Sequence, residues 1–305
     1  VNKEGLIEVV GRDKLRIDYT DTDKGVALLE NSSTNLLTYS EDFSNSAWVK
    51  FGQGNGSAPI ITSNYAISPD GTQNATRLQC DLGGGNVVND RSYLYQSISN
   101  ISGDNTISLY VKNNSNETKT FLLSNGSDNT TVILSDNKWH RLYNVKNGGS
   151  QPRIGLMGGG NSNDTLDISI WGCQIEANSV ASSYIPTSGS SVQRAADVAN
   201  NAGNSEVFSD SSGVLYANIA ALANDGVNKF ISISDGTIAN RINIVFDTSN
   251  NISARQAPGS VNISTSGVNI LNSNKIAYEY QSGSQELWVN GFKIGETSVS
   301  SLPSG

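Results

Sequence analysis

The chain has 305 residues and a formal net charge of −8, and only 16% of the residues are Asp, Glu, Lys or Arg. The sequence contains no cluster of Lys and Arg, which excludes the cationic footprint of a nucleic-acid-binding protein. It also contains no apolar run near the roughly 20 residues of a membrane span, so we expect neither a nucleic-acid partner nor membrane insertion.

The first part of the sequence predicts short strands separated by turns. The chain begins with Val1 and its single methionine is Met157, so we expect a processed product or a piece of a longer protein. Residues 1–34 are interpreted as an N-terminal β segment or linker, in which "KLRIDY" alternates.

Residues 35–187 show short runs of strand-forming residues bounded by Gly, Asn, Asp or Ser, with no helical pattern between them. This pattern predicts an all-β domain, an antiparallel jelly-roll β-sandwich. The expected strands cover residues 76–82, 91–99, 105–113, 119–125, 130–135, 138–145, 153–158 and 166–177.

A boundary follows, and a second β region comes after it. The stretch 182–197 has a proline and a Ser/Gly run without periodicity, and we place a linker at 188–200. Residues 201–305 predict a second β-sandwich, in which Asn290-Gly291 favours a type I′ hairpin turn. No closing strand precedes the last residues, so this sandwich is expected to be incomplete, truncated at its C-terminal side.

Strand parity separates aliphatic from aromatic side chains. Aromatic rings stack on the C–H faces of sugars while polar neighbours bind hydroxyl groups, so rings opposite the aliphatic face are candidate carbohydrate-binding residues. The alternative is that loops or a neighbouring subunit cover this face, making the rings ordinary packing. The candidates are Tyr93, Tyr95, Tyr110 and Trp171, with Asp167 and Lys112 beside them, and Trp288 in the second domain.

The sequence shows no catalytic constellation. The single histidine, His140, lies in a strand pattern, and no nucleophile elbow or phosphate loop is present. By parity Cys80 faces the core and Cys173 the opposite side, so we expect both to be free thiols. The 28 acidic residues leave a glycosidase carboxylate pair open, but we expect no enzymatic activity.

Several segments resemble known proteins in their order and spacing. Residues 17–50 ("IDYTDTDKGVALLENSSTNLLTYSEDFSNSAWVK"), followed by 68–78 and 170–198, resemble tailed-bacteriophage tail-fibre and receptor-binding proteins. The first domain is similar to jelly-roll carbohydrate-binding modules. Residues 274–296 are similar to concanavalin A-like or laminin-G-like domains.

The resemblance implies a virion surface protein of a phage tail or appendage, made in the cytoplasm of the bacterial host. It implies a homotrimer that contacts other virion proteins and host surface polysaccharide. Related modules hold a structural calcium ion, for which Glu41, with Asp167 or Glu176, would supply oxygen ligands; no other cofactor is expected.

Three functions follow from these observations. The first is a non-catalytic adhesion module that binds cell-surface glycans through aromatic residues on a sheet face. The second is a purely structural spacer or decoration protein whose aromatic residues are buried. The third is a depolymerase that degrades host capsule.

Overall fold

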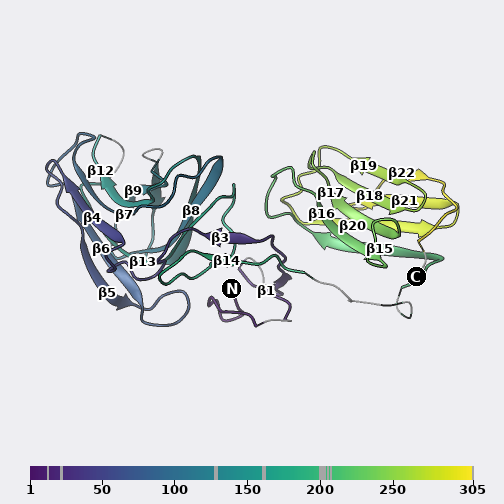
Figure 1. Cartoon of the computed structure of the whole chain (residues 1–305), viewed down its shortest axis with the longest axis horizontal. Coiled ribbons are helices and arrows are strands. Elements are labelled where there is room, and N and C mark those ends of the chain that lie inside the picture. The colour runs from purple at the N-terminus through teal and green to yellow at the C-terminus, as the bar shows by residue number, and fades with distance from the viewer. Residues whose placement is uncertain are drawn as a thin grey trace. The chain divides into compact units, whose positions relative to one another are not determined.

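The computed structural model describes residues 1–11, 14–20, 23–126, 130–159, 163–198, 204, 206 and 208–303. In this part of the chain every regular element is a strand, β1 to β22, which confirms the predicted all-β class. No helix long and apolar enough to cross a bilayer occurs among these residues. The chain divides into two compact units, Val1–Val198 and Ala199–Gly305 (Figure 1).

Two five-stranded antiparallel sheets form the body of the first unit, in the orders β10-β9-β12-β7-β4 and β11-β8-β13-β6-β5. The chain passes repeatedly from one sheet to the other, as in a jelly roll. The strands are β4 (Trp48–Gln53), β5 (Ile60–Ala66), β6 (Ala75–Asp81), β7 (Arg91–Gln96), β8 (Asp104–Asn113), β9 (Lys119–Ser124), β10 (Thr131–Leu134), β11 (Trp139–Asn147), β12 (Arg153–Met157) and β13 (Thr165–Glu176).

The core of this unit lies between the two sheets. Alternate residues of each strand face inward because successive side chains of a strand point to opposite faces. Leu94 and Ile154 from one sheet and Leu109 and Ile168 from the other join one buried cluster, each fully shielded from solvent. The predicted antiparallel β-sandwich is therefore confirmed.

One strand changes its inward face part of the way along. The register of β13 against β8 shifts between Trp171 and Gln174, and Gly172 has a φ of +61°. This β-bulge turns Cys173 into the core cluster, so the parity prediction for Cys173 is wrong. Cys80 and Cys173 are both free, as expected, and both are buried.

The segments before β4 and after β13 belong to the same unit. Two small sheets occur there, formed by β1 (Ile17–Asp18) with β2 (Val26–Ala27) and by β3 (Ser33–Asn35) with β14 (Val192–Arg194). The expected boundaries at 34/35 and 187/188 therefore differ from the contacts, which reach from Val1 to Val198. Sequence patterns missed this because β3 and β14 are short and far apart in the chain.

The second unit also contains two antiparallel sheets. Their orders are β15-β20-β21-β22 and β16-β17-β18-β19, and a separate core of Ile, Tyr, Leu and Val side chains lies between them. Asn290 and Gly291 both have positive φ, which confirms the predicted hairpin turn between β21 and β22. The strands are β15 (Ser212–Ile219), β16 (Lys229–Ser234), β17 (Arg241–Phe246), β18 (Ile252–Ala257), β19 (Val261–Thr265), β20 (Asn274–Gln281), β21 (Ser284–Val289) and β22 (Phe292–Thr297).

Candidate functional site

The four aromatic residues expected on one surface of the first unit do not form a common face. Tyr93 and Tyr95 lie on β7, whereas Tyr110 and Trp171 lie on β8 and β13 of the other sheet. All four are outside the main core cluster, as parity predicts. However, the outer faces of two stacked sheets point in opposite directions, so a single surface carrying all four rings is excluded.

Two of these rings are also sealed by the unit's own chain. Trp171 is 2% exposed and its ring lies 4.7 Å from that of Tyr184, in the segment that follows β13. Tyr93 is 3% exposed and stacks on Phe51 of β4 with 5.0 Å between ring centroids. Tyr93 and Trp171 are therefore packing residues, and the expectation that they are open to a sugar is wrong.

The polar residues expected beside these rings are engaged or half-buried. Arg77 Nε and Asn114 Nδ2 both donate to Asp167 Oδ1, each at 2.9 Å. The Arg77 guanidinium holds the pKa of Asp167 below its usual range. Lys112 is half-buried on the same face, paired in register with Ser169.

The three carboxylates expected to bind calcium do not come together. Asp167 pairs with Arg77, and Glu41 Oε1 accepts a hydrogen bond from the Tyr184 hydroxyl at 2.9 Å. Glu176 is buried and accepts from the Ser33 hydroxyl at 2.5 Å. Within the described ranges no group of three or more His, Cys, Asp or Glu could hold a metal ion, and the structural calcium ion stays a prediction.

An exposed aromatic face does occur in the second unit, on the sheet β15-β20-β21-β22. Trp288 is 36% exposed and Tyr216 is 58% exposed. The register places Tyr216 opposite Ala277, and Ala277 opposite Trp288, in one row across three strands. The small Ala277 therefore separates two rings by two strand spacings, roughly 9.6 Å.

Charged residues orient the ring of Trp288. Its indole nitrogen donates to Glu286 Oε2 at 3.0 Å, and Lys293 forms an ion pair with Glu286 at 2.7 Å. These partners hold the indole in place beside polar groups. Strand parity predicted Trp288. It missed Tyr216, because β15 carries apolar residues on both of its faces and the sequence does not show which strand pairs with it.

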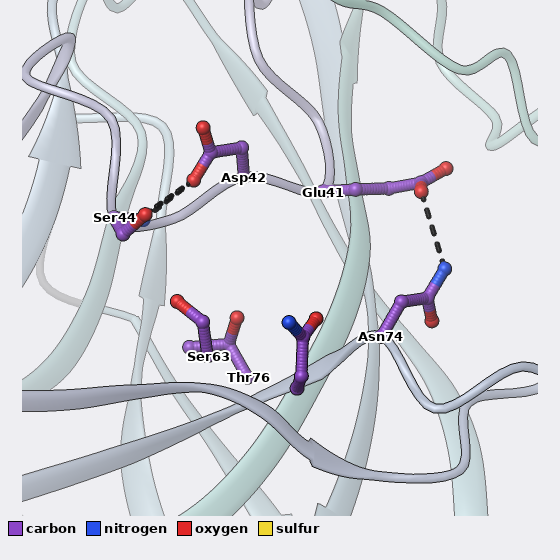
Figure 2. Close-up of a pocket in the computed structure, with 7 residues that line it drawn as sticks. Glu41, Asp42, Ser44, Ser63, Asn74 and Thr76 are labelled. Carbon is purple, nitrogen blue, oxygen red and sulfur yellow. Dashed lines mark hydrogen bonds between the residues drawn. The ribbon is translucent and has the colours of Figure 1, made fainter.

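A polar pocket opens in the first unit, between the loop before β4, the edge strand β5 and the neighbouring strand β6 (Figure 2). Its volume is about 320 Å³. The side chains that line it carry carboxylate, hydroxyl or amide groups. They belong to Glu41, Asp42, Ser44, Ser63, Asn64, Asn74 and Thr76.

The electrostatics of this pocket are dominated by acids. Burial raises the pKa of Glu41, and the nearby charge of Asp70 adds to this, while the hydrogen bond from Tyr184 opposes it. Asn74 Nδ2 lies 3.3 Å from Asp70 Oδ2 and 3.5 Å from Glu41 Oε2, so the amide bridges two carboxylates. Of these groups the sequence prediction singled out Glu41 alone.

The two cysteines lack the environment of a catalytic nucleophile. Burial raises the pKa of the Cys80 thiol to about 12 and also raises that of Cys173, whereas a cysteine nucleophile needs a lowered pKa. His140 pairs with Asp136 at 2.6 Å at the exposed surface. The absence of an enzymatic function stays a prediction.

Neither a protein-family model nor a curated protein matches the chain. The CBM22-1–CBM22-2 tandem of a Paenibacillus barcinonensis protein is similar over 90% of this chain and 88% of its own, at 14% identity and a TM-score of 0.35. The CBM22-1–GH10 modules of a Clostridium thermocellum xylanase, complexed with xylohexaose, match over 47% of this chain and 27% of theirs, at 12% identity and a TM-score of 0.28. The tailspike protein 4 domain of bacteriophage CBA120 matches over 46% of this chain and 21% of its own, at 15% identity and a TM-score of 0.29. At these values the likenesses carry no argument about a ligand.

Proposed function

We propose that this chain is a non-catalytic glycan-binding protein whose sugar-contacting surface is the outer face of β15-β20-β21-β22. The observation that carries this proposal is the row formed by Tyr216, Ala277 and Trp288, in which two exposed rings flank a small residue. Side chains of Glu286 and Lys293 border the row, and such polar groups bind sugar hydroxyls while the rings stack on C–H faces.

The biological setting that we propose is a virion appendage, a tail fibre or a related surface protein, that meets host polysaccharide. The support is the sequence resemblance of residues 17–50, 68–78 and 170–198 to tail-fibre and receptor-binding proteins. A homotrimer, contacts with other virion proteins and a concanavalin-like character of the second unit belong to this proposal.

The test is glycan binding by the whole chain and by variants of the aromatic row. Trp288→Ala and Tyr216→Ala should each weaken binding about tenfold or more, because truncating an aromatic anchor costs about 1–2 kcal/mol or more. Phe292→Ala is the matched control, since Phe292 is 74% exposed but lies at the hairpin turn outside the row. Binding is measured on a glycan array and quantified by calorimetry.

Stability should not change, because surface substitutions of this kind stay within about 0.5 kcal/mol. Equal affinities of the wild type, Trp288→Ala and Tyr216→Ala for every bound glycan would reject this surface. Release of reducing ends from a bound polysaccharide would reject the non-catalytic assignment.

The structural-spacer function has one observation in its favour. Trp171 and Tyr93, the rings expected to contact sugar in the first unit, are buried by that unit's own chain. A spacer would give no binding across a glycan array, while labelling with an antibody would still place the chain in assembled particles by electron microscopy.

A further inference from the structure

The polar pocket of the first unit is built by an irregularity in β5. The register between β5 and β6 shifts between Thr62 and Ala66, where three residues of β5 lie opposite the single residue Thr76. Asn64, in the middle of this bulge, has a φ of +53°. A non-glycine residue in that region costs energy, and such strain and such bulges concentrate at functional sites.

The bulge leaves the hydroxyl of a largely buried residue, Thr76, facing the pocket without a protein partner. Thr76 is 2% exposed and lines the pocket. In the described part of the chain no hydrogen bond joins its hydroxyl to another group, and none is made by the side chains of Ser63 and Asn64 beside it. Figure 2 shows Ser63 and Thr76 across the pocket from Asp42. This hydroxyl can therefore donate to or accept from a molecule bound in the pocket.

The opposite wall supplies negative charge and acceptors. Glu41 and Asp42 line the pocket and Asp70 lies next to it, whereas none of the seven lining residues is Lys or Arg. The Oδ1 atom of Asn74 is buried without a partner among the described groups. The site therefore combines carboxylates with a hydroxyl group and an amide oxygen that have no protein partner among the described residues.

We propose that this pocket binds a single sugar residue that carries a protonated amine, with the ammonium group at Glu41 and ring hydroxyls at Thr76 and Ser63. The volume of about 320 Å³ lies at the small end of ligand pockets and fits one ring rather than a chain. The carboxylates disfavour acidic sugars by like-charge repulsion, and a neutral sugar lacks the charge-assisted hydrogen bond. This inference rests on the proposed glycan binding, but it names a second site in the other unit.

The experiment is calorimetric titration of the whole chain with methyl β-glucosaminide, with methyl β-glucoside and methyl β-glucuronide as comparisons. We expect the amine-bearing sugar to bind about tenfold more tightly than the neutral one, and the acidic sugar not to bind. Glu41→Gln and Thr76→Val should each weaken glucosaminide binding about tenfold. Ser63→Ala, at an exposed lining position, should weaken it less.

Phe292→Ala is the matched control and should leave glucosaminide binding unchanged, since Phe292 lies in the second unit and outside the aromatic row. If glucosaminide does not bind while the aromatic row binds glycans, the pocket assignment is overturned and the proposed function stands. Equal binding of the neutral and amine-bearing sugars also overturns it. Calcium chloride alone is titrated in the same way. If it binds to the wild type and not to Glu41→Gln, the pocket is assigned to a cation instead.

Discussion

At the scale of single residues, Asp167 is held as a carboxylate by Arg77, with its pKa lowered chiefly by the hydrogen bonds from that guanidinium. A lowered pKa contributes stability above the unfolded value of about 3.9, and this contribution is lost as the pH falls through the folded value. Asp167→Asn should therefore lower the free energy of unfolding at pH 7 by on the order of 1 kcal/mol or less, because the pair is partly exposed. The melting temperature should fall with it.

Thermal unfolding followed by circular dichroism at several pH values checks this prediction. The difference in melting temperature between the wild type and Asp167→Asn should vanish below about pH 4. Glu4→Gln, at an exposed site, should melt at the wild-type temperature throughout. A difference that stays constant from pH 7 down to acid would contradict the role of the carboxylate charge.

Gly172 is the residue that lets β13 turn Cys173 inward. Its φ of +61° disfavours any side chain, and a Cβ there would lie 3.2 Å from the rings of Tyr110 and Tyr184. Gly172→Ala should lower the free energy of unfolding by about 1–2 kcal/mol from the backbone alone, and more if the rings cannot move.

Urea unfolding measures this change. Gly84→Ala is the matched control, because Gly84 has a φ of +77° and a Cβ added there would meet no atom within 4 Å. The loss for Gly172→Ala beyond that for Gly84→Ala reports the crowding of the rings. Equal losses would mean that the two rings move aside freely.

At the scale of elements, strands with clear periodicity could be predicted from the sequence. Residues 105–113 and 166–177 correspond to β8 and β13 within one residue at each end, because alternating or continuous aliphatic runs fit a half-buried or buried strand. β4 and β5 were missed. They are edge strands that place few aliphatic residues in the core, and β5 contains the bulge that breaks its alternation.

The candidate sites could be predicted only in part, for the same physical reason. Parity tells which side of a strand a ring occupies, and it placed Trp171 and Trp288 outside the aliphatic core. Whether that side is covered depends on other segments, such as the one carrying Tyr184. The pocket of Figure 2 depends on the register of β5 against β6, which no local pattern encodes.

At the scale of the whole molecule, the first unit is closed by chain segments from both of its ends. β3 and β14 pair, as Figure 1 shows, although they are separated by the whole sandwich in sequence. Arg16 forms ion pairs with Glu30 and Asp197. These contacts join the first 35 residues to residues 183–197 and make them part of one folding unit.

This closure predicts that the fragment 35–187 is less stable than the fragment 1–198, although the shorter one retains all ten strands of the two sheets. Removing Ser33 leaves the buried Glu176 with one hydrogen-bond partner fewer, and a buried carboxylate without its partners is costly. The urea midpoint of the fragment 35–187 should lie well below that of the fragment 1–198. Within the fragment 1–198, the substitution Arg16→Ala should also lower the midpoint, but by a smaller amount. Equal midpoints for the two fragments would show that the sandwich is stable without its terminal segments, and that β3, β14 and the ion pairs of Arg16 contribute nothing to it.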